Sequence, residues 1–206
     1  MRIRILVALA LCAGLKLLGV DKTAPSVQEF TVDASRSNVE FTLGAVLHTV
    51  HGRFTVKSGM VRFDAATGRA SGRIVVDLRS GNTGVQERDR HMHEEVLESE
   101  RFPEALFTLD RVTGQISSEG HVLVHGILRI HGQDHEITVP ARVRAYDRQV
   151  SGSANFVVPY VEWGMKDPST FVLRVKDTVN VTVNLVGTLQ NSTVASESST
   201  QTRILY

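Results

Sequence analysis

The chain has 206 residues, a formal net charge of +1 and one cysteine. This length is enough for one domain with a sizeable core. A charge so close to zero argues against a nucleic-acid-binding surface, which needs clustered Lys and Arg. Because the only cysteine is Cys12, near the N-terminus, the rest of the chain folds without a disulfide. That is compatible with a bacterial periplasm, where disulfides are allowed but not required.

The first 24 residues have the pattern of an export signal. Arg2 and Arg4 precede an apolar run over residues 5–11, and Lys16 interrupts the apolar stretch before it reaches the roughly 20 residues of a membrane span. We therefore expect a signal peptide at 1–24, with an uncleaved anchor as the alternative, and a periplasmic or secreted protein. Residues 190–206 are rich in Ser and Thr and are expected to form a flexible tail. A single domain at 25–189 remains.

Four stretches in the first half of that domain alternate apolar and polar residues, as half-buried strands do. They are residues 38–43, 50–57, 60–64 and 73–79. In the first of them Val39, Phe41 and Leu43 share one face, and the others follow the same period of two. We expect turns between them at Ser58-Gly59 and Thr67-Gly68.

Residues 80–101 break this alternation. The block opens with Gly and Asn turn signals, continues into charged helix formers and holds the cluster Arg88-Asp89-x-His91-Met92. We expect one short helix at 86–97. Because loops and insertions on a rigid sheet often carry function, we also expect a special site beside it.

Five further alternating stretches follow, at 106–112, 120–130, 137–143, 151–159 and 179–185, with a turn at 131–135. Short antiparallel strands joined by Gly-containing turns close best as a barrel, because closure removes edge strands. The expected fold class is all-β, an antiparallel barrel of about eight strands with one short helix. Such a barrel is either filled by its own side chains or holds one small ligand, and the alternation is the same in both cases.

Three groups of residues resemble motifs of the YceI-like family and occur in the family's order. The first is Val39-Glu40-Phe41-Thr42-Leu43 with Val50-His51-Gly52-Arg53-Phe54 and Ser58-Gly59; the second is Thr83-Gly84, Arg88-Asp89-x-His91-Met92, Phe102-Pro103 and Phe107; the third is Val124-x-Gly126-x-Leu128-x-Ile130-His131-Gly132. The resemblance covers about residues 28–189. It implies a lipocalin-like β-barrel in an exported protein that holds a polyisoprenoid or other long-chain lipid in an elongated apolar cavity. The chain departs from the family pattern at 44–48 and 159–169.

The charged cluster is one candidate contact for such a ligand. Arg88 carries a planar guanidinium that suits phosphate oxygens, so the segment from Arg88 to His91 is a candidate site for an anionic headgroup. The alternative is a structural cluster in which Asp89 pairs with Arg88 and caps the helix.

Other candidates come from strands and loops. His48 has the inward parity of Val50 if its strand begins early enough, and is then either a ligand contact or an ordinary core histidine. Tyr160 and Trp163 belong to an aromatic loop that either caps the cavity mouth or plugs one end of the barrel. The full set of candidate ligand-binding residues is Phe41, His48, Phe54, Phe63, Arg88, Asp89, His91, Met92, Phe107, Phe156, Tyr160 and Trp163.

The sequence offers little support for catalysis or metal binding. His48 and His51 fall on opposite faces of a strand, and His91 and His93 diverge on a helix. No Gly-x-Ser-x-Gly motif is present. We expect a non-enzymatic carrier without cofactor or metal, whose partners are a polyisoprenoid or other apolar lipid and, transiently, a membrane; a homodimer is left open. The alternatives are an enzyme acting on a small hydrophobic or lipid substrate, and a filled barrel that serves as a stress-related interaction module.

Overall fold

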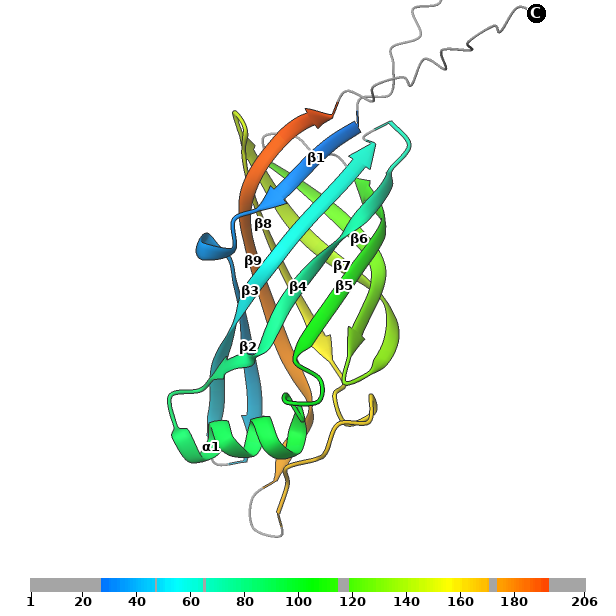
Figure 1. Cartoon of the computed structure of the whole chain (residues 1–206). Helices are drawn as coiled ribbons and strands as arrows, with labels where there is room; N and C mark the ends of the chain where they lie inside the picture. The colour runs from blue at the N-terminus through cyan, green and yellow to red at the C-terminus, as the bar shows by residue number, and fades with distance from the viewer. Residues whose placement is uncertain (1–26, 47, 65, 115–118, 171–173, 193–206) are drawn as a thin grey trace, which may run out of the picture.

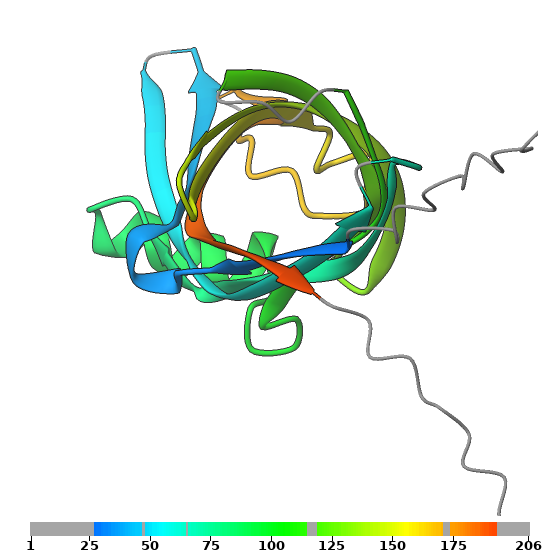
Figure 2. The same ribbon diagram turned by 90° about the horizontal axis from the view of Figure 1, so that it is seen from above.

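The computed structural model describes residues 27–46, 48–64, 66–114, 119–170 and 174–192. Within these residues, nine antiparallel strands form one sheet that closes into a barrel, and Figure 2 shows the ring of strands seen along the barrel axis. The strands are β1 (Val27–Val32), β2 (Asn38–Ala45), β3 (Thr49–Asp64), β4 (Arg69–Asn82), β5 (Glu104–Gly114), β6 (Glu119–Ile130), β7 (Gln133–Tyr146), β8 (Gln149–Val158) and β9 (Val175–Ser192). The expected all-β barrel is confirmed.

The nine strands occupy eight positions in the barrel wall. β1 and β2 both pair with β3 on one side and β9 on the other, one beyond the other along the barrel axis. The 3-10 turn η1 (Ala34–Arg36) separates them, and the Asp33 carboxylate caps it by accepting a hydrogen bond from the Ser35 amide at 3.0 Å. The other neighbours follow chain order from β3 to β9.

The strand boundaries differ from the sequence-based expectation in three places. The turn expected at Ser58-Gly59 is wrong, because β3 runs through it with a register shift between Val56 and Ser58, a bulge that bends a long strand around the barrel. The turn expected at 131–135 is only His131 and Gly132, whose φ angles of 51° and 75° are those that a two-residue hairpin loop requires. The alternation did not predict β1.

One end of the barrel is covered by segments that follow β4 and β8. After β4, α1 (Gln86–His91) continues into a π-helical turn, η2 (Met92–Val96), which confirms a short helix near the expected range. Residues 159–165 lie at the same end (Figure 1), and in Figure 2 this golden segment crosses the ring at its far end. Between them lies a buried cluster, which we call the plug, of Leu97, Val158, Tyr160 and Met165.

Some expectations concern residues beyond these ranges. The signal peptide expected at 1–24 lies outside the described residues. β9 extends to Ser192, so residues 190–192 of the expected tail belong to a strand, and the rest of the tail lies outside the described part. In the described part, no helix is long and apolar enough to cross a membrane.

Candidate functional site

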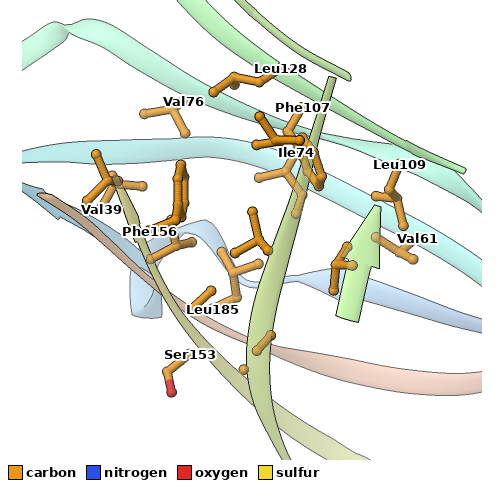
Figure 3. A pocket seen from close by; sticks show the side chains of 18 of the residues that line it. Val39, Val61, Ile74, Val76, Phe107, Leu109, Leu128, Ser153, Phe156 and Leu185 are labelled. Carbon is orange, nitrogen blue, oxygen red and sulfur yellow. The ribbon is translucent and has the colours of Figure 1, made fainter. Parts of the chain in front are cut away.

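The inward-facing side chains enclose an apolar cavity that runs along the barrel. Its volume, counted as space open to the centres of water-sized molecules, is about 280 Å³. All nine strands contribute to its lining, from Phe30 on β1 to Leu189 on β9. Among the described lining residues Ser153 has the only polar side chain, and Figure 3 shows its hydroxyl directed away from the apolar side chains. A cavity with this lining cannot compensate a buried charge but offers favourable surroundings to a hydrocarbon chain.

The barrel is hollow because three small residues face inward side by side on β7 and β8. Ala141 pairs with Ala154 in the ladder, and Gly152 pairs with Val143 two residues further on. A Cβ atom placed on Gly152 would have no neighbour nearer than 3.9 Å, so the space in front of this glycine is open. These small residues are the sequence signal that distinguishes a hollow barrel from a filled one, and the alternation alone did not reveal it.

Four of the candidate aromatic residues line the cavity: Phe54, Phe63, Phe107 and Phe156. Phe41, which we also expected at the ligand, is buried but is not part of the lining. Its ring lies 5.2 Å from the ring of Phe54 and occupies the space that a side chain on Gly52 would need, 2.3 Å from an ideal Cβ. Phe41 therefore supports a lining residue from behind.

The Arg88–Asp89 pair holds the turn between β4 and α1 and does not reach the cavity lining. Asp89 accepts hydrogen bonds from the amide of Thr83 at 2.8 Å and from its hydroxyl. Arg88 donates from Nε to the Thr83 hydroxyl at 2.8 Å and from Nη2 to the Thr83 carbonyl at 3.1 Å. The structural alternative is thus favoured, but with a different geometry: both side chains bind Thr83, and the cap residue of α1 is Val85, without a side-chain hydrogen bond.

His91 and Met92 connect the helical segment to the rest of the covered end. His91 Nδ1 lies 2.9 Å from a Glu95 carboxylate oxygen, and Lys166 of the segment after β8 donates to the same carboxylate. The hydrogen bond from Lys166, followed by that from His91, lowers the pKa of Glu95. Met92 packs against the plug. Neither residue is part of the cavity lining.

Tyr160 and Trp163 do not belong to the cavity lining, and their packing in and against the plug favours the expectation that the aromatic loop plugs one end of the barrel. The Tyr160 hydroxyl donates to the carbonyl of Lys176 at 2.8 Å, and burial raises the pKa of Tyr160 to about 12. Trp163 packs against the plug and against a cluster of the cavity-lining residues Leu78, Ala105 and Leu128. Its indole ring stacks on the imidazole of His135, with ring centres 3.9 Å apart and planes within 8°. Burial lowers the pKa of His135.

The remaining candidate, His48, does not face the cavity. β3 begins at Thr49, so the condition for an inward His48 is not met, and its side chain is exposed. His121 and His125 share the outer face of β6, and His125 lies between the carboxylates of Asp110 and Glu136 at 2.6 and 3.0 Å.

A closed eight-stranded antiparallel barrel with an apolar lumen defines a lipocalin-type architecture. Comparison with protein families gives the particular family: the YceI-like domain model matches residues 30–187. The chain therefore belongs to the YceI-like family, which confirms the resemblance seen in its motifs. No curated protein matches the chain in sequence.

Solved structures show the same fold at low sequence identity. A polyisoprenoid-binding domain from Saccharophagus degradans, implicated in plant cell wall breakdown, has a TM-score of 0.65 and 19% identity, over 78% of this chain and 98% of that one. BcnA of Burkholderia cenocepacia has a TM-score of 0.62 and 19% identity, over 75% and 98%. The YceI protein of Campylobacter jejuni has a TM-score of 0.56 and 20% identity, over 68% and 84%.

Proposed function

We propose that this protein binds a polyisoprenoid or another long-chain apolar lipid in the lumen of its barrel and carries it without chemical change. The observation that supports this most directly is the cavity itself, which is long, apolar and lined by every strand. The structurally similar domain from Saccharophagus degradans is described as polyisoprenoid-binding, which points to the same class of ligand.

Burial of hydrocarbon supplies the binding free energy in this proposal. Each methylene moved from water into an apolar cavity contributes about 0.8 kcal/mol. Because the described lining has no inward polar side chain, affinity depends on chain length, and a polar headgroup stays outside the apolar part of the lumen.

The same lining argues for carriage over catalysis. General acid–base chemistry needs a titratable side chain within hydrogen-bond reach of the reacting atom. The described residues that line the cavity include no His, Asp, Glu, Lys, Arg, Tyr or Cys. A hydrocarbon chain in the lumen is therefore surrounded by unreactive groups.

The N-terminal pattern of residues 1–24 favours a place for this carrier outside the cytoplasm. Lipids must cross aqueous space between membranes there, and a barrel that shields an apolar chain meets that need. Cell fractionation, together with N-terminal sequencing of the mature protein, tests this part of the proposal; an uncleaved chain in the cytoplasmic fraction would contradict it.

The first experiment is native mass spectrometry of the protein purified from a bacterial envelope, followed by organic extraction. The expected result is a stoichiometric lipid with a long apolar chain. Protein that carries no lipid and does not bind added retinol, farnesol or fatty acids would refute the carrier function and favour an interaction module.

A further inference from the structure

The ladder between β7 and β8 covers only part of both strands. The two strands pair only from Ala141–Ala154 to Tyr146–Gln149. By contrast, β6 and β7 pair from Glu119–Arg144 to Ile130–Gln133, and β8 pairs with β9 along its whole length. In a continued register, residues 137–140 of β7 would lie opposite residues 155–158 of β8, but these described residues have no ladder pairing with each other, and we call this part of the wall the seam. Along β8 the seam is about 14 Å long, at about 3.4 Å per residue.

Side chains close the seam where the backbone does not. From the inside, Ile137 and Val139 of β7 and Phe156 of β8 cover it, and all three line the cavity. At its lower end the Trp163 ring stacks on the His135 ring. Figure 3 shows Phe156 among the side chains around the cavity.

Within the described chain, no backbone hydrogen bond joins the turn at residues 159–165 to β7. The amides of Trp163, Gly164 and Met165 bond to the carbonyls of Pro159, Val161 and Tyr160, inside their own turn, and the amide of Val161 bonds to Asp177 of β9. The turn therefore contacts β7 through side chains. Apolar contacts of this kind are weak individually and can be exchanged for contacts with a ligand of the same character.

The outside of the barrel is hollowed where the seam begins, and the lining of the hollow combines apolar residues such as Leu123 with polar ones such as Arg142. A surface hollow of about 690 Å³ lies over the last paired residues, and it shares Val122, Ala141, Ser153 and Ala154 with the inner cavity. These four residues border both the outer hollow and the lumen. Two large apolar side chains beside it are exposed, Leu123 on β6 at 49% and Val157 on β8 at 54%. Exposed apolar residues that gather beside a cavity often mark the place where an apolar ligand arrives.

We propose that the seam is a lateral portal, through which a lipid chain passes sideways between β7 and β8 when the Trp163 ring leaves His135. This inference rests on the proposed lipid-binding function and adds the route and the moving group. A chain that passes through the seam leaves every paired ladder of the barrel intact. A lipid chain that instead enters through the opposite end of the barrel, past the β3–β4 and β7–β8 hairpins, would not pass through the seam.

The test ties the seam shut. In a Cys12→Ser background, Thr138→Cys with Val157→Cys places two exposed thiols where a continued register would pair them, and a short bis-maleimide links them. The control pair, Arg144→Cys with Ser151→Cys, spans the same two strands at a position where they are already paired. Stopped-flow fluorescence of retinol, an isoprenoid, gives the rates of uptake and release.

We expect the seam cross-link to slow both uptake and release at least ten-fold with little change in Kd, and the control cross-link to leave both rates unchanged. As a second reading, Trp163→Ala without cross-links should speed exchange at least ten-fold while the protein stays folded by circular dichroism. Parent-like rates in the cross-linked seam variant, or in Trp163→Ala, would overturn the portal and favour passage through the hairpin end. Absence of retinol binding in the parent protein would instead refute the proposed function, and the portal with it.

Discussion

Gly152→Phe should abolish most lipid binding while preserving the barrel. Gly152 faces the lumen, and an added side chain meets open space, with the nearest atom, the carbonyl oxygen of Arg142, at 3.9 Å from the new Cβ. The benzyl group then fills part of a cavity of about 280 Å³. Phe also favours the extended backbone that this position already has.

The size of the effect follows from the hydrocarbon that the ring displaces. If the benzyl group takes the place of about four methylenes, the lost transfer free energy is about 3 kcal/mol, at about 0.8 kcal/mol each. That corresponds to a rise in Kd of roughly 100-fold to 200-fold. The chain has a single tryptophan, Trp163, which packs against the cluster of cavity-lining residues Leu78, Ala105 and Leu128. Quenching of Trp163 fluorescence by retinol therefore measures the Kd directly.

The matched control is Ser151→Phe, which places the same ring one residue away, on the exposed face of β8. We expect parent-like affinity for this variant. If Gly152→Phe is folded, by circular dichroism and thermal unfolding, and still binds retinol as the parent does, the ligand does not occupy the lumen and the reasoning is wrong.

Three further predictions concern stability. Arg88→Ala and Asp89→Ala should each lower the free energy of unfolding by about 1–3 kcal/mol in urea, because they leave partly buried groups of Thr83 without partners, and should leave the retinol Kd unchanged; a large loss of affinity would restore the headgroup role of Arg88. Gly52→Ala should cost about 1–3 kcal/mol because its Cβ would meet the Phe41 ring at 2.3 Å, whereas Gly152→Ala should be neutral or stabilising by up to about 1 kcal/mol; equal effects would contradict the packing described. Burial lowers the pKa of His135 despite the opposing charges of Asp134 and Glu162, so the neutral ring is favoured in the fold, and this contribution is lost as pH falls below about 6.5. The Tm of His135→Gln should accordingly fall less than that of the parent between pH 7 and 5. The Tm of His125→Gln should instead fall more than that of the parent between pH 7 and 5, because hydrogen bonds to Asp110 and Glu136 raise the pKa of His125.

The inward faces of the strands could be predicted from the sequence because the pleat of a strand imposes a period of two. Val39, Phe107 and Leu185 all face the lumen as their alternation indicates. The positions of bulges and hairpins were harder to predict from the sequence. A bulge at Ser58 keeps an alternating strand continuous, and its Ser-Gly sequence also suits a turn, so local composition could not decide between the two.

The partners of the charged residues and the seam depend on tertiary structure. Arg88 is attractive as a phosphate ligand on chemistry alone, and only the position of Thr83 shows that its Nε and Nη2 already donate hydrogen bonds within the protein. Pro140 was the available hint to the seam. A proline has no amide hydrogen and is usually confined to edge strands or bulges, and this one lies directly before the first residue of β7 that pairs with β8.

The pairing of β9 with both β1 and β2 also determines when this barrel can form. Val27 pairs with Ser192, and Asn38 pairs with Asn184. The strands that pair here are thus separated in sequence by almost the whole domain. Contacts of such long sequence separation form late and slow folding, because the loop must close before any stabilising contact is made. A nascent or partly exported chain that lacks β9 therefore has two unpaired sheet edges, and at this stage, before the barrel closes, the protein is most prone to aggregation.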